Sequence, residues 1–287
     1  MSTPEGTIVM ATRDRATVVP RTLERLLALP EGWPVILVDD ASTDGTADVV
    51  RASFPEVQVI RLPESRGAGA RNVGTATADT ELVAFADDDS WHEPGALRVA
   101  AGHFRDHHDL GLLAARCIVH PAGTDDPVSE SQVSSPLPST APGPSVLGFL
   151  SCTAVVRRQA FLDVGGFHPV IGFLGEEEVL AMDLRAAGWR VVHVPEVVVH
   201  HHPGQASGGR EGRRALQMRN RALTRWLRRP LTVALAATGR LAVAAPRDAD
   251  ARTALAGVAG RLPAALADRR RLPAAVESDL RTLESQP

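Results

Sequence analysis

Lysine is absent from this chain of 287 residues, and cysteine occurs only twice. Two cysteines cannot build a disulfide framework, so we expect Cys117 and Cys152 to be small buried thiols in a reducing compartment. The chain also lacks any run of about 18 apolar residues, which excludes a membrane-spanning helix. No basic and apolar segment with a small-residue end opens the chain. We therefore expect no secretory signal and a cytoplasmic location.

The net charge is small, −3, but the charges are unevenly distributed. Residues 204–287 hold 16 arginines and 7 acidic residues, a net +9, whereas residues 1–203 hold 15 arginines and 27 acidic residues, a net −12. The hydrophobic share of 44% and the charged share of 23% are typical of a globular protein. An acidic body followed by a basic tail indicates two parts with different roles. We expect a body over 1–204 and a basic helical extension over 205–287.

Strands and helices are expected to alternate in the first hundred residues. Continuous apolar runs between amphipathic helices are typical of parallel strands covered on both faces. The crossovers should be right-handed, which gives an α/β fold with an open, doubly wound sheet. Ligands of such sheets bind beyond the carboxyl ends of the strands. We expect strands at 8–11, 35–38, 57–60 and 82–85, and helices from Pro20, over 47–50 and over 67–78.

The second half of the chain is less regular. Residues 121–145 hold six prolines among Ser, Thr and Asp without periodicity, which predicts an irregular loop. After residue 208 the chain is Ala-rich and Arg-rich, with prolines that should break it into helices. We expect an apolar segment at 146–156, a helix at 177–187, strands at 191–194 and 197–199, and helix breaks at Pro230, Pro246, Pro263 and Pro273.

Three acidic residues, Asp87, Asp88 and Asp89, directly follow the apolar run 82–86. Hard divalent cations take oxygen ligands, and Mg²⁺ or Mn²⁺ commonly completes its shell with substrate phosphates and water. Carboxylates at positions i and i+2 of an extended turn can reach one ion. The alternative is a solvated acidic turn that caps the helix beginning near Pro94, and both interpretations remain open on these residues alone.

Another acidic pair, Asp39 and Asp40, ends the second apolar run. An acidic residue at a strand end is a recurrent device for holding a ribose or a base. The alternative is local, because Ser42, Thr43 or Asp44 is expected to begin the next helix and the turn before it can use one aspartate. That turn hardly needs both aspartates.

Segment 67–72 is rich in small residues and opens a helix. Its glycines allow close approach of the backbone, and a helix N-terminus favours anions. A phosphate could therefore bind at this helix entry. Close packing of the helix on the sheet explains the glycines equally well, so this segment alone leaves both interpretations open.

Two more clusters contain side chains that can act as a general base or as metal ligands. Glu176, Glu177 and Glu178 stand where a helix begins, and they either complement the helix dipole or supply a general base. Three histidines at 200–202 follow an apolar strand, so alternation places 200 and 202 on one face and 201 on the other. Neutral imidazole is a common metal ligand, although a histidine is more often structural.

Seven segments of the chain, taken together, resemble family 2 glycosyltransferases of the GT-A fold, in the order expected of that family. The resemblance covers about residues 7–203. It implies a doubly wound, mixed and mostly parallel sheet with helices on both faces, followed here by the C-terminal basic helical extension. The segments are ATRDR (11–15), VILVDDASTDGT (35–46), RGAGARNVG (66–74), FADDDSW (85–91), VVRRQAFLDVGGFHP (155–169), GEEEVLAMDLRAAGWRVVHVP (175–195) and VVVHHHP (197–203).

The resemblance implies a nucleotide site at the strand ends. Ala11 and Thr12 correspond to the edge of the first strand that holds the base, and Asp40 corresponds to the residue that contacts the base, with Asp39 its neighbour. Arg71 corresponds to the arginine that reaches the nucleotide. Asp88, the middle residue of the acidic triplet, would face the ribose or the sugar.

The resemblance also implies metal ligands and a catalytic base. Asp87 and Asp89 match the ends of a DXD motif, with Asp89 the direct ligand of Mn²⁺ or Mg²⁺. His201 matches a histidine that follows the last strand and helps to bind metal, and His200 is one residue away from that alignment. Glu177 takes the position of the base, and Glu176 precedes it as the first residue of the acidic pair.

Three residues depart from the family pattern. Glu177 replaces the aspartate that commonly serves as the base, so its carboxylate is one methylene further from the backbone. Asp183 stands where the family commonly has arginine. Ala222 stands where a Gln-x-x-Arg-Trp motif would need glutamine, although Arg225 and Trp226 are present. The missing motif argues against a processive polysaccharide synthase and for transfer of a single sugar.

The predicted function is metal-assisted transfer of one sugar, with inversion, from a nucleotide-diphosphate sugar to an acceptor hydroxyl. The acceptor is a glycan, a lipid-linked molecule or a small molecule. One alternative is a nucleotidyltransferase on a related sheet, which the lack of a glycine-rich loop after residue 12 disfavours. Another is a catalytically degenerate GT-A domain that serves as a binding module.

The basic tail leaves two interpretations open. Its Arg-rich helices either lie on anionic lipid at the inner face of a membrane or form an ordinary solvated extension. Nucleic acid is not an expected partner, because no aromatic residues are interleaved with the basic ones.

Overall fold

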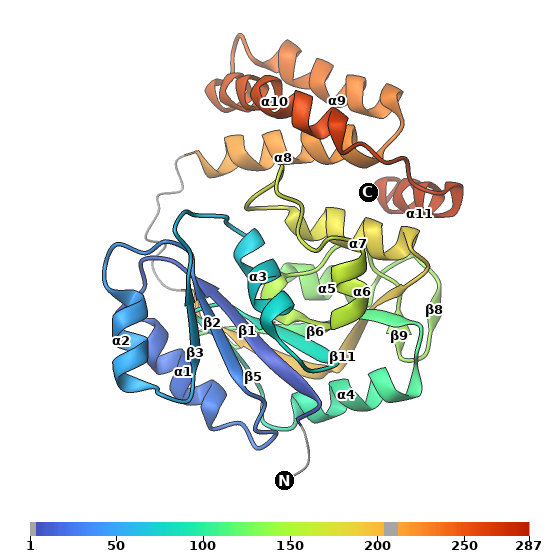
Figure 1. Ribbon diagram of the computed structural model, residues 1–287. Coiled ribbons are helices and arrows are strands. Elements are labelled where there is room, and N and C mark those ends of the chain that lie inside the picture. Colours follow the sequence, from blue (N-terminus) through green and yellow to red (C-terminus); the bar gives the residue numbers. More distant parts are fainter. Residues whose placement is uncertain (1–3, 204–211, 287) are drawn as a thin grey trace.

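The computed structural model describes residues 4–203 and 212–286. A large mixed sheet carries helices on both faces, and further C-terminal helices lie above one of these helical layers (Figure 1). The α/β class expected from the sequence is confirmed by this arrangement. No helix within the described ranges combines the length and the apolar character needed to cross a membrane.

The main sheet has nine strands in the order β3-β2-β1-β4-β10-β6-β11-β5, with β7 paired to β6. Six of them run in the same direction, whereas β5, β7 and β10 run against their neighbours. A small second sheet pairs β8 with β9. The strands are β1 (Gly6–Thr12), β2 (Val35–Asp39), β3 (Gln58–Arg61), β4 (Leu82–Ala86), β5 (Ser90–His92), β6 (Leu110–Val119), β7 (Thr124–Asp125), β8 (Ser139–Thr140), β9 (Gly143–Pro144), β10 (Ala154–Arg157) and β11 (Arg190–His201).

Helices cover both faces of this sheet and extend beyond it (Figure 1). A short 3₁₀ helix, η1 (Ser151–Thr153), precedes β10. The α-helices are α1 (Val19–Leu27), α2 (Thr46–Ser53), α3 (Gly69–Thr77), α4 (Ala96–Asp106), α5 (Pro127–Val133), α6 (Arg158–Asp163), α7 (Glu176–Ala186), α8 (Arg213–Arg228), α9 (Leu231–Ala244), α10 (Ala249–Ala267) and α11 (Ala274–Glu284).

Two apolar clusters form the core, one on each face of the sheet. Leu23 of α1 and Leu97 of α4 pack against side chains of β1 such as Ile8 on one face. On the other face, Phe161 of α6 and Leu180 of α7 belong to a second cluster built on the alternate strand residues. The alternation of strand side chains between the faces explains why continuous apolar strands serve both clusters.

The C-terminal helices are packed onto the body by a third apolar cluster. Val170 and Val179 of the body share it with Leu223 of α8, Val258 of α10 and other residues of α8–α10. In Figure 1, α8 lies over α7, and α11 lies at the end of α7 away from the sheet. The expected boundary at residue 205 lies outside the described residues, as does the expected start of the helices at 208.

The region 121–145 is not only a loop, which corrects the expectation from its composition. It contains α5 and three two-residue strands, β7, β8 and β9. Proline is tolerated in the first turn of a helix, and Pro127 occupies that place in α5. The carboxylate of Asp126 accepts a hydrogen bond of 2.8 Å from the backbone N–H of Val128, which caps the helix.

Two other elements differ from the expectation. Pro263 lies inside α10 and does not end it. Buried Val258 before the proline and buried Ala265 after it both hold the helix against the molecule, so packing overrides the missing hydrogen bond. The two short strands expected at 191–199 form one strand, β11, with a register shift between Val194 and Val198.

Candidate active site

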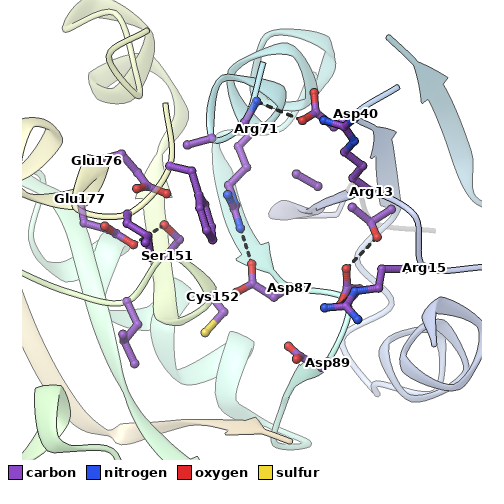
Figure 2. Close-up of a pocket in the computed structure, with 18 of the residues that line it drawn as sticks. Arg13, Arg15, Asp40, Arg71, Asp87, Asp89, Ser151, Cys152, Glu176 and Glu177 are labelled. Carbon is purple, nitrogen blue, oxygen red and sulfur yellow. Dashed lines mark hydrogen bonds and ion pairs between the residues drawn. The ribbon is translucent and has the colours of Figure 1, made fainter. Parts of the chain in front are cut away.

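A pocket of about 640 Å³ opens at the carboxyl ends of β1, β2 and β4. Figure 2 shows Glu176 and Glu177 on one side of it, Arg13 and Asp40 on the other, and Arg71 with Asp87 between them. Ten of the twelve site residues expected from the sequence line this pocket, while Asp39 and His200 do not. The ten are Ala11, Thr12, Asp40, Arg71, Asp87, Asp88, Asp89, Glu176, Glu177 and His201.

The two aspartates after β2 have different roles. Asp40 lines the pocket, and its carboxylate accepts hydrogen bonds from Ser65 Oγ at 2.6 Å, Arg66 N at 2.6 Å and Gly67 N at 3.0 Å. Asp40 therefore also fixes the turn that leads into α3. Asp39 is fully buried, and its Oδ1 accepts from Ser42 N at 2.9 Å, so this is the aspartate that the local turn uses.

The helix after this pair begins later than expected. α2 starts at Thr46, after Gly45 in the left-handed conformation, and not at Ser42, Thr43 or Asp44. Asp44 still stabilises the first turn, because its Oδ1 accepts from Thr46 N at 3.0 Å. The side chain of residue 44 thus caps the helix from outside it.

Arg71 stands at the centre of the pocket with its guanidinium paired to the carboxylate of Asp87. The side chain is buried, and its Nε has no hydrogen-bond partner among the residues that the structure describes. Burial by itself would lower the pKa of Arg71, but the carboxylates of Asp87 and Glu176 outweigh it and raise the pKa. Arg71 is therefore a fixed cation at the pocket, and its pairing with Asp87 does not engage all five of its N–H donors.

Asp88 connects the acidic turn to β1. Its Oδ2 accepts a hydrogen bond from Thr12 Oγ1 at 2.8 Å, and its Oδ1 lies 3.4 Å from Arg15 Nε. Burial raises the pKa of Asp88 to about 6, while the hydrogen bond from Thr12 and the charge of Arg15 oppose that rise. Thr12 at the end of β1 and Arg15 after it thus stabilise the charged form of Asp88.

Asp89 pairs with His201 across the strands β5 and β11. His201 Nε2 lies 3.3 Å from Asp89 Oδ1, and the hydrogen bonds to Asp89 and Cys117 raise the pKa of His201 to about 10. The backbone just after β11 supports the same turn, because His202 N donates to the carbonyl of Asp89 at 2.9 Å.

His200 points to the other side of β11, and the structure does not bring it to the pocket. Its Nδ1 lies 3.0 Å from Nε2 of His120, and its ring stacks on Trp91 with centroids 5.4 Å apart. Side chains alternate along a strand, so only one of two neighbouring histidines can face the site. The pocket is lined by His201.

A metal ion fits this site only together with a substrate. The described residues contain no group of three or more His, Cys, Asp or Glu side chains arranged to hold an ion. Asp87 is already paired with Arg71, which leaves Asp89 and His201 as a carboxylate and an imidazole in contact. Mg²⁺ or Mn²⁺ commonly takes one or two protein ligands and completes its shell with phosphate oxygens and water, and this donor pair suits that pattern.

Two adjacent glutamates begin α7 and face Arg71 across the pocket (Figure 2). Glu176 is 2% exposed and its Oε2 has no partner in the described part of the chain. Burial, together with the charge of Glu177, raises the pKa of Glu176 to about 8. Burial also raises the pKa of Glu177, whose Oε1 accepts a hydrogen bond of 2.9 Å from Ser151 Oγ.

Comparison with known proteins identifies the family. Residues 7–165 match the family described as glycosyl transferase family 2. The chain belongs to this family. The family 2 chain is 32% identical over 203 residues to the pre-mycofactocin glycosyltransferase of Mycobacterium tuberculosis, a match that covers 68% of this chain and 42% of that protein. The chain therefore spans less than half the length of this relative.

Other relatives agree with this assignment. The N-acetylglucosaminyl-diphospho-decaprenol L-rhamnosyltransferase of M. tuberculosis is 28% identical over 221 residues, covering 63% of this chain and 70% of that one. The mannosyltransferase PcManGT of Pyrobaculum calidifontis, solved with GDP-Man and Mn²⁺, has a TM-score of 0.61 at 20% identity. That match covers 98% of this chain and 80% of the other, and it confirms the GT-A fold expected from the sequence.

One of the three departures from the family 2 pattern, Asp183, has a structural explanation. Asp183 accepts two hydrogen bonds from the guanidinium of Arg228 on α8, so an acidic residue there binds the C-terminal helices. Trp226 is buried in the helical layer and donates from Nε1 to Thr238 Oγ1 at 2.9 Å. Arg225 donates a hydrogen bond to the backbone carbonyl of Arg221. Neither Arg225 nor Trp226 lines the 640 Å³ pocket.

Several pocket residues were not anticipated from the sequence. Arg13, Arg15, Ser151 and Cys152 all line it, as does Arg213 at the start of α8. The polar run after β1 was the available signal for the first two. Ser151 and Cys152 belong to η1, a short element without a pattern in the sequence. Cys152 and Cys117 are both buried free thiols, as expected.

Proposed function

We propose that the chain transfers a single sugar from a nucleotide-diphosphate sugar to an acceptor hydroxyl, with inversion at the anomeric carbon. The observation that carries this proposal is the pocket in which Arg71, Asp87 and Asp89 face Glu177. The names of the relatives, two of which state the transfer of a sugar, support the reaction class. The GDP-Man in the PcManGT structure supports a nucleotide-sugar donor.

The donor would occupy the β1, β2 and β4 side of the pocket. Ala11, Thr12 and Asp40 would border the base, and Asp88 would face the ribose or the sugar. Arg71 would attract a phosphate oxygen through the positive charge that it places in the pocket. This placement uses the carboxyl ends of the strands, where ligands of open α/β sheets bind.

Asp89 and His201 would hold Mn²⁺ or Mg²⁺ beside the donor diphosphate, and His201 would release the proton that Asp89 stabilises on it, because only an unprotonated imidazole nitrogen ligates a metal. The bound cation would neutralise the negative charge that develops on the leaving nucleotide diphosphate. Arg71 keeps Asp87 beside this place and contributes a second positive charge. Asp88 is held away from it by Thr12 and Arg15.

Glu177 is proposed as the general base. Ser151 orients its carboxylate through the 2.9 Å hydrogen bond. Burial raises the pKa of Glu176 to about 8, so this glutamate keeps its proton at neutral pH, and Glu177 is the member of the pair that Ser151 orients. Glu177 would take the proton of the acceptor hydroxyl while the acceptor oxygen attacks the anomeric carbon and the nucleotide diphosphate leaves.

The metal assignment can be tested by the effect of Mn²⁺ on nucleotide binding. We expect Mn²⁺ to increase the thermal stabilisation of the wild-type chain by a nucleoside diphosphate, since binding to the folded state raises its stability. Asp89→Ala and His201→Gln should lose that increase. His200→Gln is the matched control, because His200 faces away from the pocket and should leave the increase unchanged.

A wild-type chain whose nucleotide affinity is insensitive to Mn²⁺, or an Asp89→Ala variant that keeps the increase, would contradict the assignment. Release of pyrophosphate from a nucleoside triphosphate would instead point to a nucleotidyltransferase.

The proposed contact of the C-terminal helices with anionic lipid is supported by the exposed Leu231, Leu235 and Val243 of α9. Flotation with anionic vesicles tests it, and absence from the vesicle fraction would refute it.

A further inference from the structure

The segment that leads into α7 has a backbone that must be held from outside. Gly172, Leu174 and Gly175 have φ angles of 79°, 69° and 89°. Such left-handed values are uncommon for a leucine and persist only where the surroundings impose them. Helix α7 begins directly after Gly175, and the proposed base, Glu177, is its second residue. The path of this segment therefore determines where the side chains of the first turn of α7 lie.

Each backbone carbonyl from residue 170 to residue 174 accepts a hydrogen bond from another part of the chain. Four of these five bonds come from side chains of the C-terminal helices α8 and α10, and the fifth comes from the backbone just before α3. The donors, in the order of the carbonyls, are Arg261 Nη1 at 2.6 Å, Arg219 Nη2 at 3.2 Å, Ala68 N at 2.7 Å, and Asn220 Nδ2 at 2.6 Å and again at 2.7 Å.

Asn220 of α8 makes the two contacts nearest to the proposed base. Its Nδ2 donates to the carbonyls of Phe173 and Leu174, and its Oδ1 accepts from Arg219 Nε at 2.9 Å. Since an amide nitrogen only donates and an amide oxygen only accepts, Arg219 fixes which end of the carboxamide faces the segment. The Asn220 side chain is 1% exposed, so water does not compete for these bonds.

Asn220 can influence the reaction only through this segment. Phe173 and Leu174 line the 640 Å³ pocket, whereas Asn220 does not. The Glu177 side chain is held at its other end, because its carboxylate accepts a hydrogen bond of 2.9 Å from Ser151 Oγ. The proposed base is thus supported at its carboxylate by Ser151 and at its backbone by the segment that Asn220 holds.

We propose that Asn220 is a positioning residue of the active site. By holding the carbonyls of Phe173 and Leu174, it fixes the start of α7 and with it the direction of the Glu177 carboxylate. The C-terminal helices would then complete the active site as well as extend the chain. The proposal rests on the proposed function, because it takes Glu177 as the base.

The alternative role of Asn220 is to anchor α8 to the body and nothing more. Other contacts already provide that anchor, namely the apolar cluster that includes Leu223 and the pairing of Arg228 with Asp183. Burying a carboxamide is costly unless its hydrogen bonds are made. Asn220 makes its two donor bonds to the two carbonyls directly before Gly175, where the backbone is left-handed, and this placement favours positioning.

The first test separates the rate of donor hydrolysis from donor affinity. The probe is the UDP-, GDP- or dTDP-sugar that most raises the melting temperature of the wild type with Mn²⁺, and water replaces the acceptor. Asn220→Ala and Asn220→Asp should lower the single-turnover rate about 10²-fold, the loss expected when a catalytic group moves by about 1 Å. Donor affinity should keep its wild-type value, because Asp40 holds the turn on the nucleotide side. Aspartate keeps the shape of asparagine without its donors, so a loss in both variants does not come from a cavity.

Arg229→Ala is the matched control. Arg229 directly follows α8, is 3% exposed, and pairs with Glu277 and Glu284 of α11. Its loss should destabilise the chain but preserve the hydrolysis rate at temperatures where the variant is folded. A wild-type rate in Asn220→Ala would overturn the proposal. So would an equal loss of rate in Arg229→Ala, or a parallel loss of rate and donor affinity in Asn220→Ala.

The pH dependence of stability gives a second readout that needs no turnover. Loosening the start of α7 would admit water to Glu176 and lower its pKa from about 8 toward its ordinary value of 4.5. The decrease of melting temperature from pH 5 to pH 9 should then be weaker in Asn220→Ala and unchanged in Arg229→Ala. The charged groups that act on Glu176 are Glu177, Arg71 and Asp87, so removal of the uncharged Asn220 acts through burial alone. An unchanged decrease in Asn220→Ala would show that Asn220 does not hold the start of α7.

Failure of this proposal is separable from failure of the proposed function. If the wild type hydrolyses a nucleotide sugar and Asn220→Ala does so equally well, the proposed function stands and the positioning role is wrong. If the wild type hydrolyses none of the sugars, the proposed function fails together with any catalytic role of Asn220. The pH dependence of stability then still reports whether Asn220 holds the start of α7.

Discussion

Three consecutive aspartates in the pocket have three different partners. Asp87 is paired with Arg71 of α3, Asp88 with Thr12 of β1, and Asp89 with a histidine of β11. Each partner comes from a different element, so the acidic turn is held in place from three directions. This distribution keeps neighbouring negative charges apart before any ligand enters.

Replacing the proposed base should separate chemistry from binding. We expect Glu177→Gln to lower the rate of transfer by about 10²–10⁴-fold, the usual contribution of a general base. The affinity for the nucleotide donor should change little, because the amide keeps the size of the side chain and its contact with Ser151. Single-turnover rates and donor affinities measure the two effects. Glu177→Asp should keep part of the rate, and full turnover by Glu177→Gln would refute the role.

Stability should fall as pH rises through the range in which Glu176 titrates. The pKa of this glutamate is about 8 in the folded chain, above its ordinary value of 4.5, because burial disfavours its charge. Between these two values the folded state binds more protons than the unfolded state, so the free energy of unfolding decreases with pH. Glu176→Gln should weaken that decrease. Melting temperatures from pH 5 to pH 9 test this.

Part of the decrease should persist in the variant, since burial also raises the pKa of Glu177 and of Asp88. A pH dependence that is identical in Glu176→Gln and in the wild type would show that Glu176 does not titrate in this range.

Most of the residues around the pocket were predictable because they follow apolar strands. Which of two adjacent residues in the chain would face the pocket could not be predicted. Asp39 and Asp40, like His200 and His201, differ only in which face of the strand they occupy, and a shift of one residue exchanges those faces. The pairing of Arg71 with Asp87 was also unpredictable, because it depends on how α3 lies on the sheet.

At the scale of the elements, α3 lies unusually close to the sheet. A Cβ atom built on Gly74 would stand 2.4 Å from Val9 Cγ1 of β1 and 3.1 Å from Val38 Cγ2 of β2. Arg71 belongs to α3, so the distance between this helix and the sheet determines where the guanidinium lies in the pocket. The small-residue pattern at 67–74 is therefore explained in part by close packing.

Two glycine substitutions should have opposite effects. Gly74→Ala would force the helix away from the strands, and we expect a destabilisation of about 1–3 kcal/mol, as for other overpacked cores. Gly239→Ala in α9 has open space around its new methyl group and should stabilise the chain by up to about 1 kcal/mol through helix propensity. Urea unfolding measures both. Equal effects of the two substitutions would contradict the packing explanation.

The strands that build the donor pocket were predictable because each is a continuous apolar run closed by polar residues. Strand β6 has the same character over 110–115 but was not among the expected strands. Helix α5 was missed because its prolines suggested a loop, while the structure uses Pro127 in the first turn. Local composition could not show that α10 would continue through Pro263, because this depends on the packing of residues before and after the proline.

At the scale of the whole molecule, buried ion pairs join the C-terminal helices to the body. Arg228 of α8 is 3% exposed and binds Asp183 of α7 at 2.5 and 2.7 Å. The next residue, Arg229, binds Glu277 and Glu284 of α11. The charge pattern of the sequence predicted a separate basic part, but it did not reveal these partners, which lie far away along the chain.

Loss of one buried arginine should therefore be costly. Arg228→Ala would leave the largely covered carboxylate of Asp183 without its partner, and we expect a destabilisation of up to about 3–5 kcal/mol. Arg214→Ala removes an exposed arginine from Asp248 and Asp250 and should leave stability nearly unchanged. Denaturant unfolding compares them. Similar losses in both variants would show that the buried pair does not anchor the helices.

The position of Glu177 at the junction of two cavities has a kinetic consequence. The 640 Å³ pocket and a neighbouring cavity of about 250 Å³ both include this side chain, yet they share no other lining residue. Two substrates can therefore occupy the enzyme at once without displacing each other. Initial velocities measured at several concentrations of both substrates should give intersecting double-reciprocal lines, the pattern of a sequential mechanism, and not the parallel lines of a ping-pong exchange.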